Sequence, residues 1–561
     1  MNRTRMIRGA KHEIPADLVI KNGRIVNVFT KEILEGDVAI VDGSIVGIGA
    51  YEGLETIDAV GQYLIPGLIN AHVHIESSMM TPSGYAGLIA PRGTTTIIAD
   101  PHEIVNVAGA TGLSFMLEDS ADLAVDMFFM IPSSVPATAQ ETNGAGEFLS
   151  KDMAPFLGHS RILGLGEVMC IDDVLQARAH ILDKIQSCEG RVIDGHAPGL
   201  SGASLQAYRA AGIETDHEAV SGEEAVERLR AGFYLQVREG SAAHDLVPIL
   251  KAVKGQNLPT ERILLCTDDR HSSDIRTQGD IDHCVRLAMA VGYDAITAIQ
   301  MATINTAQAY GLRQYGAIAP GYQADILFCD NLESFHITAV YKKGKNIQPL
   351  LSDTKALATC PTLLNSVVLD GIKPSDFAFP LEAGKKSAGI EIIPGDIRTL
   401  AFEAELPEEG GFFKASKLYS KLAVVERYGK NGNRAVAPIR GYGIEGGAVA
   451  MTIAHDSHNI IVCGDNDGDM AVAVEKIHEI QGGIVVVSQG SVLGSLALPV
   501  GGLMSTASWP EMERGLTKLL TLAHGLGVSE TIDPFITLSF MALPVIPEIR
   551  LTDRGLVRVQ A

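Results

Sequence analysis

The chain has 561 residues, which is too long for one ordinary hydrophobic core and predicts more than one domain. Hydrophobic residues make up 46% of it and charged residues 20%, a balance typical of a soluble globular protein and not of a disordered or fibrous one. With 45 Lys and Arg against 67 Asp and Glu, the formal net charge is -22, and a surface of this sign repels nucleic acid.

The sequence carries no sign of export or of a membrane span. Its first 20 residues are basic but lack an apolar core followed by a cleavage site, so we expect no signal peptide. Residues 481–509 are uncharged, but Gly, Ser, Gln and Pro interrupt them and their β-branched cluster has only the length of a strand. The seven cysteines are scattered and form no C-x-x-C pair, which fits the reducing cytoplasm. We therefore expect a cytoplasmic protein with no membrane or nucleic-acid partner.

Two segments, one near the start of the chain and one after its long middle part, have the pattern of β structure. Residues 17–29 and 36–50 alternate apolar and polar residues and contain Asn-Gly and Asp-Gly, which are hairpin signals. Residues 316–345 show a similar pattern. We predict one small β-sandwich domain assembled from residues 1–63 and 313–362, on either side of a long middle segment.

The middle segment, residues 64–312, contains eight short apolar runs that end in polar residues, separated by helix-compatible stretches such as residues 171–188. Their ends recur about every 28 residues, close to the roughly 30 of a strand-helix unit. This spacing predicts a (β/α)8 TIM-type barrel; an open doubly wound sheet is the alternative, but it needs fewer repeats and its G-x-G-x-x-G signature is absent. The residues that mark the eight strand ends are His72, Asp100, Ile131, Glu167, His196, His217, Arg238 and Asp268.

The remainder of the chain, residues 363–561, begins with a link that contains Pro and Gly. It mixes strand-like and helix-like segments and is rich in glycine. We predict a separate C-terminal α+β domain.

Metal-ligating side chains gather at the predicted strand ends. His72 and His74 are two residues apart, so on a strand both point to the same side. In a parallel barrel the carboxyl ends of the strands form one rim, which adds Glu167, His196, His217 and Asp268. Zn, Mn and Fe(II) favour this mixture of nitrogen and oxygen ligands. The alternative is a set of hydrogen-bonded polar groups at a barrel end, but burying six titratable groups without an ion is costly.

These motifs resemble those of the amidohydrolase superfamily and, within it, of the bacterial adenine deaminases. The superfamily pattern is H-x-H after strand one, a carboxylate at strand four, histidines at strands five and six and Asp at strand eight. Many members use a carboxylated lysine at strand four, whereas adenine deaminases have Glu there, as this chain does. Segments that carry the closer resemblance are "NAHVHIESSM", "ADPHEIVNVAG", "DGHAPGLSG", "ETDHEA", "REGSAAHDL", "LCTDDRH" and "AHDSHNIIVCGDND".

The resemblance implies hydrolytic deamination of adenine to hypoxanthine and ammonia, with hydroxide attacking C6. It implies two divalent cations, Mn or Fe(II) ahead of Zn, with His72, His74 and Asp268 on one, His196 and His217 on the other, and Glu167 bridging. Asp268 would accept the proton of the hydroxide and pass it to the amino group. We favour Asp268 over Asp269 as the ligand because it follows the short apolar run directly.

Other polar residues near the strand ends are further candidates for the site, and most of them have a structural alternative. Asp100 and His102 are extra ligands or proton carriers, or else form a turn set by Pro101. Glu239 or His102 would protonate the purine ring. Arg238, Glu239 and Asp269 are candidates for substrate hydrogen bonds, although Arg238 and Glu239 fit a surface ion pair equally well. The residues His455, Asp456 and His458 look like a second ligand cluster, but we expect them to serve the packing of the C-terminal domain.

Two further functions are compatible with this barrel. One is hydrolysis of another cyclic amide or of an N-acetyl substrate. The other is a catalytically inactive scaffold, which would have lost ligands that this chain keeps. Because large barrels of this kind often assemble, we also expect a homo-oligomer, a dimer or larger.

Overall fold

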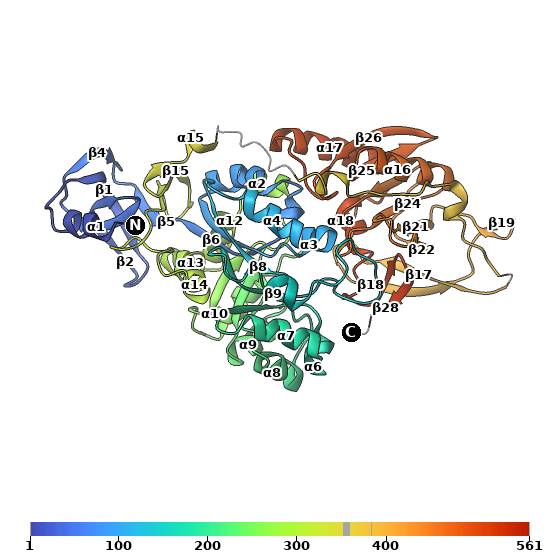
Figure 1. Cartoon of the computed structure of the whole chain (residues 1–561), viewed down its shortest axis with the longest axis horizontal. Coiled ribbons are helices and arrows are strands. Elements are labelled where there is room, and N and C mark those ends of the chain that lie inside the picture. The colour runs from blue at the N-terminus through green and yellow to red at the C-terminus, as the bar shows by residue number, and fades with distance from the viewer. Residues whose placement is uncertain (1, 352–359, 383, 560–561) are drawn as a thin grey trace.

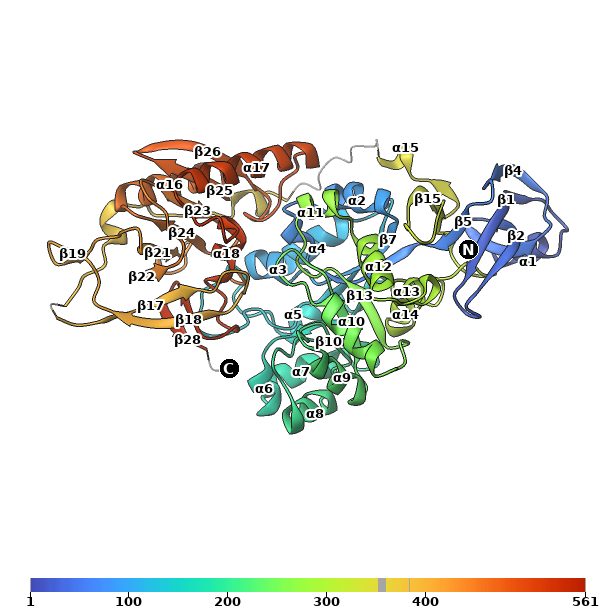
Figure 2. The ribbon, with the colours of Figure 1, turned by 180° about the vertical axis from the view of Figure 1, so that it is seen from behind.

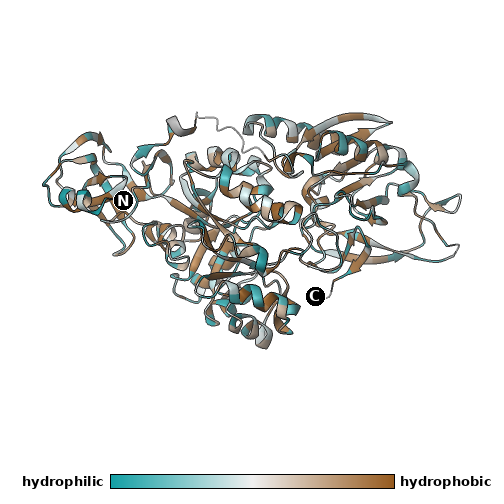
Figure 3. Ribbon diagram, in the orientation of Figure 1, coloured by the Kyte–Doolittle hydropathy of each residue, from teal (hydrophilic) through white to brown (hydrophobic). Residues whose placement is uncertain are grey.

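A computed structural model describes residues 2–351, 360–382 and 384–559. Along its long axis lie, in turn, a small β sheet that holds the N-terminus, a central barrel and a C-terminal domain (Figure 1). The view from behind shows the same order (Figure 2). Hydrophobic residues are concentrated along the strands of the barrel and of the C-terminal sheet (Figure 3). No helix in the described part of the chain is long and apolar enough to cross a membrane.

The small sheet combines strands from the two sides of the barrel. Its order is β16-β15-β14-β5-β1-β2-β3, and β4 pairs with β1. Strand β5 pairs with β1 in parallel and with β14 in antiparallel register, so it joins the two groups of strands. The strands are β1 (Ala16–Asn27), β2 (Glu32–Val41), β3 (Ser44–Gly49), β4 (Gly53–Asp58), β5 (Tyr63–Pro66), β14 (Ile326–Cys329), β15 (Ile337–Lys342) and β16 (Lys345–Asn346), preceded by helix α1 (Arg3–Ala10).

The two turn signals of this region have different outcomes. Asp42 and Gly43 both have positive φ and connect β2 to β3 as a tight hairpin, as the sequence predicts. Asn22 and Gly23 do not form a turn. They lie inside β1, where the register with β2 shifts between Ile20 and Gly23, so this Asn-Gly is a bulge in one long strand.

Eight parallel strands form the predicted barrel, so the (β/α)8 prediction is confirmed. Strands β6 to β10 pair in sequence order, and so do β11 to β13. The N–H of Glu214 donates to Ile193 O at 2.8 Å, which joins the two groups, and the N–H of Asp268 donates to His72 O at 3.1 Å, which closes the barrel. The strands are β6 (Leu68–Val73), β7 (Thr94–Ala99), β8 (Asp126–Ile131), β9 (Ile162–Val168), β10 (Val192–Gly195), β11 (Thr215–Asp216), β12 (Tyr234–Arg238) and β13 (Ile263–Cys266).

Helices surround these strands (Figures 1 and 2). The helix-compatible stretch 171–188 folds as two helices, because Ala177 has a positive φ and interrupts it. Connecting helices are α2 (Pro82–Ile89), α3 (His102–Ala108), α4 (Ala110–Asp119), α6 (Ile171–Leu175), α7 (Ala179–Ser187), α8 (Gly202–Ala210), α9 (Gly222–Arg230), α10 (Leu246–Gly255) and α12 (Ile281–Ala290).

The C-terminal domain is a mixed sheet covered on both faces. Alternate residues of its strands enter different cores: Ala448 and Ala450 pack with helix α16 (Asp467–Glu479), whereas Val449 and Met451 belong to the core that contains helix α17 (Trp509–Gly525). The sheet order is β18 (Thr399–Ala404), β17 (Ser387–Ile392), β22 (Arg434–Arg440), β21 (Tyr419–Val425), β24 (Ile460–Gly464), β23 (Ala448–Met451), β25 (Gly483–Ser488) and β26 (Ser491–Ala497).

The C-terminal domain is docked against the loops at the carboxyl rim of the barrel. The Asn459 side-chain amide donates to Thr142 O at 2.7 Å, and the Ser505 N–H donates to Met79 O at 2.9 Å. Thr142 N–H in turn donates to the Asp553 carboxylate at 2.9 Å. The barrel rim is therefore covered by a second domain.

Candidate metal centre

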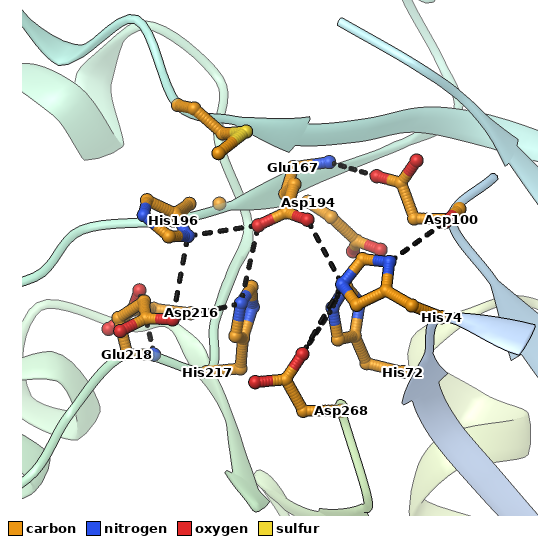
Figure 4. A network of polar contacts seen from close by, with 12 residues as sticks. His72, His74, Asp100, Glu167, Asp194, His196, Asp216, His217, Glu218 and Asp268 are labelled. Atoms are coloured by element: carbon orange, nitrogen blue, oxygen red, sulfur yellow. Dashed lines mark hydrogen bonds and ion pairs between the residues drawn. The ribbon is translucent and has the colours of Figure 1, made fainter. Parts of the chain in front are cut away.

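The predicted ligands converge at the carboxyl rim of the barrel. His72 lies near the end of β6 and His74 directly after it, while Glu167 is the penultimate residue of β9. His196, His217 and Asp268 follow β10, β11 and β13. Figure 4 shows Glu167 between the two pairs of histidines, with Asp268 on the side of His72 and His74. All six side chains are buried.

One group of potential ligands contains His72, His74 and Asp268. Nε2 of His72 lies 3.2 Å from Nε2 of His74. Oδ1 of Asp268 lies 3.6 Å from the first nitrogen and 3.2 Å from the second. Three potential ligand atoms therefore face a common point, which suits a cation.

Glu167 connects this group to the other two histidines. Its Oε1 lies 3.3 Å from Nε2 of His74. Its Oε2 lies 2.9 Å from Nδ1 of His196 and 3.3 Å from Nε2 of His217. Each oxygen thus faces a different histidine group, which is what a bridging carboxylate requires.

The neighbours of these residues fix their orientation. Nδ1 of His74 lies 2.9 Å from the carbonyl oxygen of Asp100. A carbonyl oxygen only accepts, so Nδ1 carries a proton and Nε2 is the ring nitrogen that faces the site. The Glu167 N–H donates to Oδ2 of Asp100 at 2.8 Å, and Nη1 of Arg238 donates to Oδ2 of Asp268 at 3.0 Å. These contacts hold the side chains of the site in place.

Electrostatics keep the central carboxylates ionised. Burial opposes ionisation, but the contacts with His102, His196, His217 and His74 hold the pKa of Glu167 well below its usual value. Burial and the nearby His217 lower the pKa of His72 to about 4, so its ring is neutral at neutral pH. An ionised carboxylate beside a neutral imidazole is the state in which both can bind a cation.

Several buried atoms of the site have no hydrogen-bond partner, and they test whether these residues fit a metal. Among the described residues the unpartnered atoms include Nδ1 of His72, Oε1 of Glu167, both ring nitrogens of His196 and Nδ1 of His217. Buried polar groups are almost always hydrogen-bonded in native proteins. Of these atoms, Oε1 of Glu167 and Nδ1 of His196 face the other potential ligands, and unpartnered buried atoms in that position fit metal ligation.

Two of the predicted substrate-binding residues lie at the cavity. Arg238 and Asp269 line it at the rim, and Arg238 also contacts Asp245 at 2.8 Å.

The remaining predicted site residues are Asp100, His102 and Glu239. Asp100 accepts a hydrogen bond from the Glu167 N–H and lies 3.8 Å from Nδ1 of His102. His102 is in the first turn of α3, and its Nδ1 lies 3.2 Å from Oε1 of Glu167. Glu239 faces Nδ1 of His244 at 2.8 Å, and its side chain does not line the cavity.

Sequence reasoning missed Glu218. Its Oε1 lies 3.5 Å from Nδ1 of His196 and 3.4 Å from Nε2 of His217, and it pairs with Arg238. It forms a group of three potential ligands with the two histidines. The signal was present in the sequence, since Glu218 follows His217 directly at the end of a strand.

Sequence reasoning also missed the position of the C-terminal residues. His455 and Asp456 line the same cavity as the barrel ligands, and Oδ1 of Asp456 lies 3.5 Å from Nε2 of His102. The cavity has a volume of about 50 Å³. Apolar side chains of the C-terminal domain complete its wall: Ile397, Phe540, Leu543 and Ile546.

Comparison with known proteins agrees with this architecture. The amidohydrolase family model matches residues 63–347, and the model of the adenine deaminase C-terminal domain matches residues 396–561. Adenine deaminase 2 of Carboxydothermus hydrogenoformans is 47% identical over 97% of this chain and 96% of its own length. An adenine deaminase of Geobacillus kaustophilus is 45% identical over 99% of this chain and 97% of its own length. The chain belongs to the amidohydrolases and, within them, to the adenine deaminase family, as its motifs predict.

Proposed function

We propose that this protein hydrolyses adenine to hypoxanthine and ammonia. The observation that carries the proposal is the convergence of His72, His74, Glu167, His196, His217 and Asp268 at one barrel rim. Relatives named adenine deaminase match nearly the whole chain, including the C-terminal domain that closes the cavity.

We propose that the centre holds two divalent cations, Mn or Fe(II) ahead of Zn, because all three accept imidazole and carboxylate ligands. His72, His74 and Asp268 would hold one and His196 and His217 the other, with Glu167 between them. We predict Asp100 as an additional ligand. Its Oδ2 also accepts a hydrogen bond from the Glu167 N–H, which holds the backbone of Glu167 in position. Cations of this type lower the pKa of a coordinated water and so supply hydroxide near neutral pH.

The protein itself supplies the proton transfers. Asp268 is the proposed general base, which takes the proton of the attacking hydroxide and passes it to the amino group at C6, so that ammonia leaves. Arg238 holds Oδ2 of this carboxylate at 3.0 Å. Of the two candidates for protonating the ring, His102 lines the cavity whereas Glu239 faces His244, which favours His102.

The test is ammonia release from adenine by protein reconstituted with Mn(II), compared with the Asp268→Asn variant and with metal-free protein. We expect turnover by the reconstituted protein alone. Lack of turnover by any metal-loaded preparation would reject adenine deamination. Equal activity of Asp268→Asn would reject only the general base. Dihydroorotate, hydantoin and an N-acetylhexosamine phosphate test the alternative substrates in the same assay.

We further propose that the protein works as a homo-oligomer in the cytoplasm. All seven cysteines are free thiols, which supports a reducing compartment. The proposed domains are residues 1–63 with 313–362, residues 64–312 and residues 363–561. Light scattering of the purified protein measures the oligomeric state, and a monomer would contradict the proposal.

A further inference from the structure

The C-terminal domain places one histidine on the wall of the cavity. His455 lines the cavity that holds the metal ligands and also a second cavity of about 30 Å³ beside it. The two cavities share Ala242, Asp269, His455 and Phe540, so these four residues stand where the cavities meet. A ligand that reaches from the metal ligands toward the C-terminal domain would meet His455.

Three contacts hold His455 in place, two of them through its ring. Its backbone N–H donates to Ser539 O at 2.9 Å. Its Nδ1 lies 3.1 Å from Oε1 of Glu103. Its ring stacks on Phe540 with a centroid distance of 4.8 Å and an interplanar angle of 21°. These contacts leave Nε2 as the edge of the ring without a described side-chain partner.

The charge of this ring suits a hydrogen-bond donor. Oε1 of Glu103 lies 3.1 Å from Nδ1, a distance at which a carboxylate favours a ring that carries a proton there. Burial opposes a charge on His455, but the carboxylates of Glu103, Asp269 and Asp456 raise its pKa to about 9. Nε2 then carries a proton as well and can donate it to a ligand.

A cation is the other possible occupant of this region, since atoms of Glu103, His455 and His458 lie within 4.8 Å of one another. The hydrogen bond from Ala454 N–H to Nδ1 of His458, at 3.3 Å, argues against it. When Nδ1 accepts, the neutral ring carries its proton on Nε2, which then has no lone pair for a metal. The cluster therefore suits a protonated His455 and a neutral His458 beside one carboxylate.

We propose that Nε2 of His455 donates a hydrogen bond to N3 of adenine. The inference rests on the proposed function, which turns C6 of the ring toward the metal ligands. N3 is the unprotonated ring nitrogen farthest from C6, so it faces the wall that the C-terminal domain provides. Apart from Asp456, whose ionised carboxylate cannot donate, the rest of that wall is apolar, with Phe540, Leu543 and Ile546, and a ring nitrogen buried there needs a donor. Glu103 is the positioning residue that orients the imidazole.

The test compares two ligands that carry no amino group to release, purine and 3-deazapurine, on metal-loaded protein. Calorimetry gives their dissociation constants for the parent, for His455→Leu and for His455→Gln, whose amide can still donate. His478→Gln, an exposed histidine of the same domain, is the matched control. Metal content and thermal unfolding of each variant report on its integrity.

We expect His455→Leu to weaken purine binding about 10- to 100-fold and 3-deazapurine binding by less than about threefold. His455→Gln should keep part of the affinity for purine, and kcat/KM for adenine should follow the affinity for purine. Equal losses for both ligands, unchanged purine binding or a loss of bound metal would each overturn the inference. Because binding needs no turnover, a parent protein that binds purine in this way but releases no ammonia would reject the proposed function alone.

Discussion

Asp456 of the C-terminal domain lies 3.5 Å from Nε2 of His102 in the barrel. The other ring nitrogen of His102 lies 3.2 Å from Oε1 of Glu167. A chain of contacts thus runs from the C-terminal domain through one imidazole to the carboxylate at the middle of the site. Both carboxylates raise the pKa of His102 well above its usual value against the effect of burial. The C-terminal domain is therefore part of the site and more than a cover for it.

Replacing Asp456 with Asn tests this contact. The amide keeps the shape of the side chain but loses the charge that orients and protonates His102. We therefore expect kcat/KM for adenine to fall about 10- to 100-fold, the usual effect of removing a residue that holds a metal ligand in place. Steady-state kinetics with equal metal loading measure the change. Asp370→Asn, at an exposed position of the same domain, should leave kcat/KM unchanged. Full activity of Asp456→Asn would show that the contact has no catalytic role.

Glu167→Gln tests the bridging role. The amide cannot supply two anionic oxygens to the groups around His74 and His196, so the amount of bound metal should decrease. Activity should fall by more than the 10- to 100-fold expected when a residue that only positions a ligand is replaced. Plasma mass spectrometry after dialysis measures metal per chain. Glu189→Gln, which is exposed, is the control. A variant that retains the full metal content of the parent would contradict the assignment.

A buried ion pair between the small sheet and the barrel predicts a dependence of stability on pH. Nζ of Lys342 in β15 lies 2.7 Å from Asp126 and 2.7 Å from Asp325, and the lysine is only 3% exposed. Burial alone would raise the pKa of Asp126, but Lys342 and Lys343 hold it well below 3.8. Because the pKa is lowered in the folded state, this stabilisation is fully present above the unfolded value of about 3.9 and is lost as the pH falls below it.

Lys342→Met should therefore destabilise the protein by about 3 to 5 kcal/mol near pH 7, since it removes the buried cation from two carboxylates and leaves Asp126 only its exposed partner Lys343. The difference from the parent should shrink as the pH falls below about 4, where the carboxylates become protonated. Thermal unfolding at several pH values between neutral and acidic measures both effects. Lys343→Met is the control, because this lysine is 51% exposed and its pair contributes less than about 1 kcal/mol. A difference that does not change with pH would refute the linkage.

The barrel could be predicted from the sequence because its strands are buried on both faces and end in polar residues at regular spacing. The meeting of His72 with Asp268 follows from the topology alone, since parallel strands of a closed barrel end at one rim. The bulge at Asn22 could not be predicted, because an Asn with positive φ before Gly serves a bulge as well as a turn.

The reach of the C-terminal domain into the site could not be predicted either. His455 and Asp456 follow β23, where a packing role explains buried polar residues equally well. Their approach to His102 depends on how one folded domain docks on another, and no local pattern encodes that docking. The surroundings of Glu141 could not be predicted for the same reason. This residue lies near Asp456, and burial raises its pKa to about 8.

Gly501 reports on that docking directly. It has a φ of +67°, and a Cβ added there would lie 2.3 Å from Cδ1 of Ile104 in α3, which is next to Glu103. Gly501→Ala should therefore destabilise the protein by about 1 to 3 kcal/mol through backbone strain and overpacking. Ile104→Ala removes the obstructing side chain and alone should cost about 2 to 5 kcal/mol through the cavity it leaves. In the double variant the new methyl enters that cavity. The double variant should therefore lose about 1 kcal/mol less free energy of unfolding than the sum of the losses of the two single variants. Chemical denaturation of the four proteins measures this coupling, and strictly additive losses would show that the two residues are not in contact across the domain interface.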